Sequence, residues 1–399
     1  MNASAGRARK VYSRQFWLIC ASSFFFFASF NMIIPELPEY LTSLGGAEYK
    51  GLIISLFAVT ALLSRPFSGK MADKLGRVPV MMAGSAVCLV VSILYPLFTT
   101  VWAFLLLRLI HGFSTGFTPT GQAAYLSDII PAERRGEAMG LLGTAGTIGM
   151  AAGPAVGGLI ANRFSIPFMF YCSSAMALLS LAVLSGVKET LSSRSRFSPE
   201  LFRVGRNDLF EKRVWLPCVV MGLSVYAYGT MLTLIPDFGN AVGIRNKGLL
   251  FTYFTISSLF VRLLAGRASD RYGRRKVLIV SVALIILAMY IISQGQTRGD
   301  LIIGMSLYGV AHGMTSPTLL AWATDLSDER HKGRGVASLY IFMEGGIGIG
   351  AFVSGLLLNT APNDFGSPFL ACVALSAIAL MLLLVARGKP QAPSRRVAR

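Results

Sequence analysis

The feature that most constrains this chain is a short charged segment that occurs twice. Gly69–Arg77 reads GKMADKLGR, and 197 residues later Gly266–Arg274 reads GRASDRYGR. The arginines that stand four residues before each copy, Arg65 and Arg262, have the same separation, and both copies lie between long apolar runs. A charged segment repeated at one offset in an apolar chain indicates two homologous halves. Two membrane-embedded halves that face each other are one way to build a central pathway.

The composition places these halves in a membrane. Hydrophobic residues make up 54% of the 399 residues and charged residues only 14%, whereas soluble domains carry about 25% charged residues. Apolar runs of about 17–25 residues, the length that crosses a bilayer, recur along the chain. We therefore expect an all-α integral membrane protein with twelve transmembrane helices in two pseudo-symmetric six-helix bundles. The expected spans are 16–37, 51–69, 79–97, 101–126, 137–160, 167–186, 214–235, 248–266, 277–293, 301–323, 335–358 and 367–386.

The spans group into two domains around a polar segment. We expect an N-terminal six-helix bundle at 1–187, a cytoplasmic linker at 188–213, a C-terminal six-helix bundle at 214–387 and a basic cytoplasmic tail at 388–399. Within the linker, 199–211 is either a short amphipathic helix on the inner leaflet or a solvated connector. The first apolar run is not followed by a small-residue cleavage site, so we expect it to be a retained helix rather than a signal peptide.

The lysines and arginines predict the orientation. Of the 37 such residues, 29 lie on the side of the N-terminus in this arrangement, five lie on the other side, and three lie within spans. Loops that face the cytoplasm are enriched in these residues. The asymmetry predicts a multi-pass protein of the plasma (inner) membrane with both termini in the cytoplasm. It also accounts for the net charge of +18 without nucleic acid as a partner.

The sequence offers no sign of enzyme chemistry. The five cysteines fall inside apolar runs and lack the spacing of metal ligands, so we predict neither a metal site nor a cofactor. A Walker loop and a recognisable nucleophile–base pair are also missing, so ATP hydrolysis and covalent catalysis are not expected.

Three motifs resemble one family of transporters. Gly69–Arg77 resembles the signature loop between helices 2 and 3 of the major facilitator superfamily. Leu105–Gly116, with the pattern LxxRxxHGxxxG, resembles its helix-4 motif. Gly149–Gly158, with the pattern GxxxGPxxGG, resembles the helix-5 motif of its twelve-span drug/proton antiporters. The resemblance implies proton-coupled export of small amphipathic organic molecules or drugs by alternating access. We expect a monomer that interacts with a small-molecule substrate, protons and membrane lipid.

The duplicated segments and two matching acids are predicted to gate the cytoplasmic face. An anion at a helix terminus beside basic residues can close this face and release it again, and the resemblance implies this role. The alternative is simple charge pairing at helix ends. The predicted gating residues are Gly69, Asp73, Gly76, Arg77, Asp128, Gly266, Asp270, Gly273, Arg274 and Asp325.

The fifth span is predicted to pack closely and to bend. Small residues at four-residue spacing allow two helices to approach each other, and a proline interrupts the helical ladder. The residues concerned are Gly149, Gly153, Pro154, Gly157 and Gly158. Their connection with export comes from the resemblance alone.

Four charged residues are predicted to couple transport to protons. Arg108 lies inside an apolar span, where a charge usually faces a water-filled interior or a partner. The alternative is that its side chain extends toward the membrane–water interface. Glu344 lies inside the eleventh span and is expected to be a proton site or a site for a cationic substrate. Glu39 and Asp237 occupy matching places after prolines in the two halves. For Glu39, a solvated acid at the external mouth is the alternative.

The substrate cavity is predicted to lie between helices 1, 4, 7 and 10. Aromatic and hydroxyl-bearing residues there suit an amphipathic or weakly polar ligand. The predicted lining is Phe27, Phe30, Asn31, Tyr226, Tyr228, Tyr308 and Thr315. The alternative function is specific export or import of one metabolite, such as a sugar, a metal-chelating small molecule or an organic acid. A transporter-like sensor without flux would need a large soluble domain or an extended tail, which the chain lacks.

Overall fold

The computed structural model describes residues 12–131, 134–191, 210–327, 332–361 and 364–386. Within these ranges the chain forms twelve long helices, joined by the short helices η1 (Ile34–Glu36), α2 (Leu37–Ser43), η2 (Ala47–Tyr49) and η6 (Lys212–Val214). The long helices are α1 (Arg14–Ile33), α3 (Lys50–Leu75), α4 (Arg77–Leu94), α5 (Val101–Ile129), α6 (Arg135–Arg163), α7 (Ile166–Ser185), α8 (Trp215–Ala241), α9 (Gly248–Tyr272), α10 (Arg274–Ser293), α11 (Arg298–Leu326), α12 (Lys332–Thr360) and α13 (Gly366–Val385). The predicted amphipathic segment at 199–211 lies almost wholly outside the described residues.

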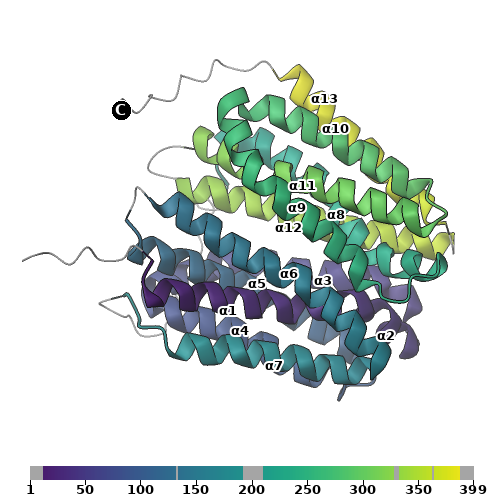
Figure 1. Cartoon of the computed structure of the whole chain (residues 1–399), viewed down its shortest axis with the longest axis horizontal. Coiled ribbons are helices and arrows are strands. Elements are labelled where there is room, and N and C mark those ends of the chain that lie inside the picture. Colours follow the sequence, from purple (N-terminus) through teal and green to yellow (C-terminus); the bar gives the residue numbers. More distant parts are fainter. Residues whose placement is uncertain (1–11, 132–133, 192–209, 328–331, 362–363, 387–399) are drawn as a thin grey trace, which may run out of the picture.

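The helices pack as two groups with the same internal arrangement (Figure 1). In the first group α1 packs on α6 and α7, and α5 packs on α3 and α4. In the second group α8 packs on α12 and α13, and α11 packs on α9 and α10. Figure 1 shows the first group in purple to teal and the second in green to yellow. The expectation of a duplicated all-helical membrane fold is confirmed.

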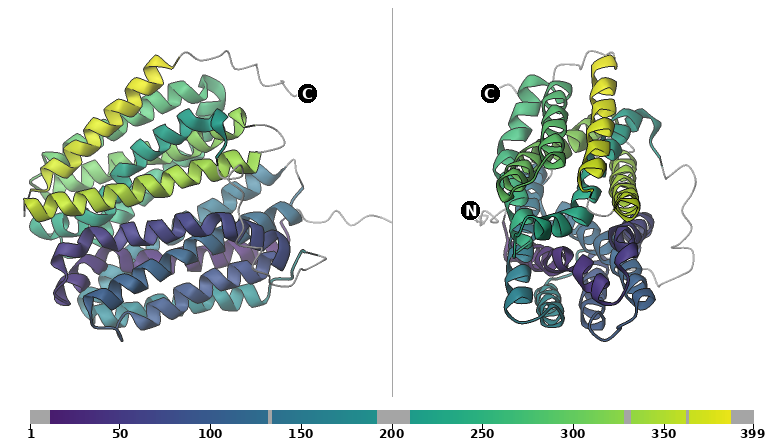
Figure 2. Two further views of the ribbon diagram at one scale, coloured as in Figure 1. Left: turned by 180° about the vertical axis from the view of Figure 1, so that it is seen from behind. Right: turned by 90° about the vertical axis from the view of Figure 1, so that its right-hand side faces the viewer.

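Two helix pairs form the seams between the groups. One seam is α3 against α12, and the other is α6 against α9. The views of Figure 2 show the two groups lying side by side with their helices running in roughly the same direction. We call the end of the molecule that holds Gly76 and Gly273 the signature end. The other end, where α3 begins at Lys50 and α9 begins directly after Lys247, is called the opposite end.

Ten helices of the described chain are long and apolar enough to cross a membrane. The two remaining long helices are α9, whose apolar stretch Gly248–Arg262 is shorter, and α11. Both lie against the other helices of the second half, where polar residues can face protein instead of lipid.

The structure corrects two details of the expected spans. The segment predicted as a charged loop after residue 69 is mostly helical, because α3 continues to Leu75 and only Gly76 separates it from α4. Gly76 and Gly273 have φ of 125° and 92°, a conformation that residues with a side chain rarely adopt. The first span is not one helix either: Pro35 and Pro38 coincide with the 3₁₀ turn η1 and a new helix, α2.

A row of glycines sets the distance between α6 and α1. A Cβ atom at Gly149, Gly153 or Gly157 would overlap the backbone of Phe24, Ala28 or Met32 respectively. The same contact recurs 197 residues later, where Gly346 and Gly350 of α12 lie against the backbone of α8. Helices in lipid associate mainly through such close packing, because no hydrophobic force drives them together.

This packing predicts a stability difference between two positions of α6. Gly153→Leu should lower the unfolding temperature in detergent by several degrees, since overpacking costs about 1–3 kcal/mol. Gly143→Leu is the matched control on the same helix, because a Cβ there meets no atom within 4 Å. Equal unfolding temperatures for the two variants would contradict the close approach of α6 and α1.

Candidate substrate and coupling site

A buried ion pair joins the two halves across the α3–α12 seam. Arg65 Nη2 lies 2.5 Å from Glu344 Oε1, and Arg65 Nε donates to the same oxygen at 3.2 Å. The side chains are 18% and 9% exposed. The Arg65 guanidinium also lies over the ring of Tyr340, 4.6 Å from its centroid. The carboxylate of Glu344 therefore has a cationic partner already, supplied by the other half.

The α6–α9 seam carries the counterpart of this arginine. Arg262 Nη1 donates to Thr147 Oγ1 at 3.3 Å. Its Nε is buried and has no hydrogen-bond partner, and Arg262 forms no ion pair with any residue that the structure describes. An unpaired charge buried among the helices of a membrane protein is costly and usually functional.

Aromatic rings connect the two seams. Tyr228 of α8 stacks on His312 of α11 with centroids 5.3 Å apart. Phe254 of α9 packs on both, at 5.6 Å and 5.4 Å. Gly229, next to Tyr228, lies against the backbone of Ile347, three residues from Glu344, and Gly313, next to His312, lies against the backbone of Ser258, four residues from Arg262. We call the following residues the central cluster: Arg65, Thr147, Tyr228, Arg262, His312, Tyr340 and Glu344.

The predicted cavity residues do not all reach this cluster. Tyr228 belongs to it. Tyr308 is fully buried and packs on Phe254 and on His312 of the cluster, with centroids 5.2 Å and 6.1 Å apart. Thr315 is buried in the packing of the second half, and Tyr226 is 6% exposed. On α1, Phe30 stacks on Phe57 with centroids 5.6 Å apart, and Asn31 donates to the carbonyl of Phe27.

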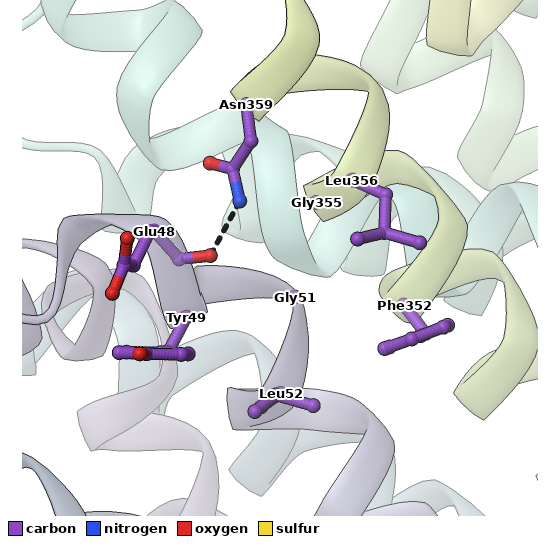
Figure 3. Close-up of a pocket in the computed structure, with 8 residues that line it drawn as sticks. All are labelled: Glu48, Tyr49, Gly51, Leu52, Phe352, Gly355, Leu356 and Asn359. Carbon is purple, nitrogen blue, oxygen red and sulfur yellow. Dashed lines mark hydrogen bonds between the residues drawn. The ribbon is translucent and has the colours of Figure 1, made fainter.

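A groove follows the α3–α12 seam toward Glu344. One pocket of about 360 Å³ is lined by Glu344 and Ser55 together with apolar side chains and glycines. It shares Leu52 and Phe352 with a second pocket of about 350 Å³, shown in Figure 3. In that view Glu48 and Asn359 mark the opposite end, where Asn359 Nδ2 donates to the Glu48 carbonyl. The two pockets thus lie next to each other along the seam, one at the opposite end and one at Glu344.

Arg108 lies inside the first half. Its side chain is fully buried, Nε donates to the Ile53 carbonyl at 2.9 Å, and Nη1 donates to the Tyr95 hydroxyl at 3.4 Å. The guanidinium lies 4.6 Å from the centroid of Phe57. Arg108 therefore joins α5 to α3 and α4, and a backbone carbonyl and an aromatic face take the place of a carboxylate.

Crossed ion pairs join the halves at the opposite end. Lys50 of the first half lies 2.6 Å from Asp237 of the second. In the reverse sense Lys247 of the second half contacts Glu39 and Glu36 of the first, the latter at 3.1 Å. Lys50 and Lys247 are also 197 residues apart. Burial would lower the pKa of Lys247, but the two facing carboxylates outweigh it and raise the pKa, so the lysine stays charged.

At the signature end each half makes the same set of charge contacts. Arg77 lies 2.9 Å from Asp73 and 3.1 Å from Asp128. In the second half Arg274 contacts Asp270 and lies 3.0 Å from Asp325. The structure thus brings each predicted acid at the end of α5 or α11 to the arginine that follows the glycine turn. These contacts lie within a half.

Glu189 completes this site in the first half, and sequence reasoning missed it. Its carboxylate accepts hydrogen bonds from the backbone N–H groups of Arg77 and Val78, at the N-terminus of α4, at 3.1 Å and 3.0 Å. Partial burial raises the pKa of this carboxyl, but four backbone N–H donors outweigh it and hold the pKa below its ordinary value. Thr190 Oγ1 donates to Asp128 at 2.6 Å.

A family comparison identifies the fold. The model of the Major Facilitator Superfamily matches residues 19–247 and 244–399, almost the whole chain. The chain belongs to the Major Facilitator Superfamily. Its members are transporters of small molecules, so the chain is a multi-pass membrane transporter, as its motifs predicted.

Relatives within the superfamily are named for drug efflux. The chain is 27% identical over 369 residues to the multi-drug resistance efflux pump PmrA of Streptococcus pneumoniae, covering 88% of this chain and 91% of the relative. It is 28% identical over 322 residues to the multidrug resistance protein MdtG of Klebsiella pneumoniae, covering 76% of each.

Solved structures share the fold at lower identity. The nucleoside transporter NupG superposes with a TM-score of 0.73 at 16% identity, over 93% of this chain and 98% of that one. A D-xylose-proton symporter superposes with a TM-score of 0.74 at 15% identity, over 93% and 97%. These likenesses show the superfamily architecture.

The residues that pair across the seams carry a signal that the sequence analysis did not use. Arg65 and Arg262 served there only to mark the repeat, and Lys50 and Lys247 were only counted among the five basic residues on the side away from the N-terminus. Each pair has the repeat offset of 197, as do Thr147 and Glu344. Charged residues at matching places in two halves are candidates for contacts across the axis that relates the halves.

The carboxylate of Glu189, which caps the N-terminus of α4, predicts that the stability of the protein depends on pH. Because the pKa of Glu189 is depressed, its stabilisation is present above the ordinary carboxyl pKa and is lost as pH falls through the depressed value. Glu189→Gln should therefore destabilise the protein at pH 7 by about 1 kcal/mol, the usual value of a helix N-cap. The difference from wild type should shrink below about pH 4. Thermal unfolding between pH 3.5 and 8 measures it.

Lys188→Gln is the control for this experiment. Lys188 is exposed and adjacent, and its backbone rather than its side chain contacts Gln15 and Tyr125. A destabilisation by Glu189→Gln that is the same at every pH would contradict the cap.

The crossed pairs predict a shift toward an open opposite end. Asp237→Asn should raise the open population by up to about fivefold, because a partly exposed pair contributes about 0.2–1 kcal/mol. Spin labels at Ser43 and Asn240, both exposed, report the separation of the halves. A Cys172→Ser background suits the labelling, because the four other cysteines are buried.

The charge-reversed pair Lys50→Asp with Asp237→Lys should restore the closed distance. If neutralisation and reversal both leave the distance distribution unchanged, the pair does not hold this end closed.

Proposed function

We propose that this transporter exports small amphipathic organic molecules, including drugs, in exchange for protons by alternating access. The observation that carries the proposal is the buried Arg65–Glu344 pair, which places a protonatable acid on the seam where the two halves meet. The names of PmrA and MdtG support efflux as the direction and drugs as the cargo.

The signature end faces the cytoplasm in this proposal. The excess of lysine and arginine on that side supports the orientation, with both termini inside and the protein in the plasma (inner) membrane. The crossed pairs then close the external end, and the chain acts as a monomer in lipid. The two bundles at 1–187 and 214–387 are the rocking bodies, and 188–213 links them on the cytoplasmic side.

Protonation of Glu344 is the central step of the proposed cycle. A neutral Glu344 loses its ionic attraction to Arg65, which weakens the α3–α12 seam and allows the halves to change their relative orientation. Glu39 and Asp237 act in the same way at the external end, where protonation of Asp237 releases Lys50 and protonation of Glu39 leaves Lys247 with Glu36 alone. Arg108 holds α3, α4 and α5 together, so the first half moves as one body.

The charge sets at the signature end act as the cytoplasmic gate. Asp73, Arg77 and Asp128, and their counterparts Asp270, Arg274 and Asp325, hold each glycine turn in shape while the halves separate. The α6 glycine row maintains the close contact with α1 during this movement.

Proton coupling predicts accumulation driven by a pH gradient. Proteoliposomes with an acidic lumen should accumulate an amphipathic dye, up to about tenfold per pH unit if one proton exchanges for one neutral molecule. Nigericin, which collapses the gradient, should abolish the accumulation. Glu344→Gln should lose the response to the gradient but retain exchange of labelled for unlabelled dye, because that exchange needs no net proton movement.

Glu48→Gln is the control, since Glu48 is an exposed acid at the opposite end of the same seam. Dye accumulation that persists without a pH gradient would contradict the proposal. A Glu344→Gln variant that still responds to the gradient would remove Glu344 from the proton pathway.

A further inference from the structure

The two seams are alike in position but not in charge. Arg65 and Arg262 occupy matching places in the two halves, and so do Glu344 and Thr147, because both pairs are 197 residues apart. The first seam joins an arginine to a glutamate at 2.5 Å. The second joins an arginine to a threonine at 3.3 Å. The central cluster thus holds two guanidinium groups and one carboxylate, and the acid is missing beside Arg262.

Two polar atoms near the missing acid have no partner. Arg262 Nε is a buried N–H donor without an acceptor, and the Nδ1 atom of His312 is also buried and unpaired. Gly313, next to His312, lies against the backbone of Ser258, one helical turn before Arg262. Native proteins pair nearly all such buried atoms, so the unpaired N–H donor of Arg262 indicates a place for an acceptor that the described chain does not supply.

The surroundings suit an organic molecule with an aromatic or apolar body. Tyr228 and Phe254 pack around His312 with centroid distances of 5.3 Å and 5.4 Å, and the ring of Tyr340 lies under Arg65, on the other seam of the cluster. Pockets with mainly aromatic walls and a few fixed polar groups bind such molecules. A guanidinium selects a planar carboxylate, because it presents parallel N–H donors in a fixed fork.

We propose that the position beside Arg262, where the first half has Thr147 instead of an acid, binds the carboxylate of an amphipathic organic acid. The substrate's carboxylate pairs with Arg262 in the way that the carboxylate of Glu344 pairs with Arg65. The apolar body of the substrate lies against Tyr228, Phe254 and Tyr340. This inference rests on the proposed transport function and specifies the class of substrate. Thr147 is shorter than glutamate, which leaves the ligand access to the guanidinium.

The test compares two probes with the same apolar body. Dansylglycine carries a carboxylate and dansylglycinamide carries a neutral amide, and fluorescence titration of the purified full-length protein in detergent at pH 7.5 measures both affinities. The wild type should bind the carboxylate at least tenfold more tightly than the amide. Thr147→Glu places an acid beside Arg262 and should abolish this preference.

Matched variants separate charge from size. Thr147→Gln has nearly the volume of Thr147→Glu without its charge, and it should keep a preference for the carboxylate. Arg262→Met should remove the preference, and if that variant fails to fold, the two Thr147 variants still decide the question. Equal binding of both probes by the wild type overturns the proposal, as does the same residual preference in Thr147→Glu and Thr147→Gln.

The failure of this inference differs from the failure of the proposed function. A protein whose export of neutral or cationic dyes is driven by a pH gradient, but which binds both dansyl probes equally, is a proton-coupled exporter without an anion site. A protein that prefers the carboxylate, but shows no transport that depends on the gradient, has the site without the coupling.

Discussion

Close backbone contact between helices is the constraint on which the other features depend. In a bilayer, helices cannot rely on hydrophobic burial to associate, so their packing depends on fit. Gly149, Gly153 and Gly157 bring α6 against α1, and the equivalent glycines bring α12 against α8. These helices carry Thr147 and Glu344 on the seams, so the glycine rows fix how far each of these side chains lies from the arginine of the other half.

Charged residues in this structure lie mainly where the halves meet and at the helix ends. The buried pair Arg65–Glu344 crosses one seam, and the crossed lysine contacts join the opposite end. Arg108 is the exception, because it is buried within one half and relies on a carbonyl, a tyrosine hydroxyl and an aromatic face. A charge that crosses a seam can respond to movement of the halves, whereas one inside a half serves its rigidity.

Much of the fold could be predicted from the sequence, because its determinants are local or periodic. The 197-residue offset predicted two halves, and the glycine spacing in α6 predicted a close helix contact. The partner of Glu344 was not predicted, since Arg65 lies 279 residues away and no local pattern connects them. Glu189 was missed for a similar reason: its role depends on where the chain after α7 meets the start of α4. Motifs describe one helix at a time, while the site is formed between helices.

The reciprocal arrangement of the crossed pairs has a consequence for how the molecule opens. Lys50–Asp237 and Lys247–Glu39 are related by the same axis that relates the two halves, so a rocking motion about the centre stretches both bonds together. Neither ion pair can therefore stay intact as a hinge while the other pair breaks. Separation at this end is therefore concerted, and a half-detached intermediate is disfavoured. The additional contact of Lys247 with Glu36 gives one of the two crossed pairs a second carboxylate, which strengthens the contact that must break in this step.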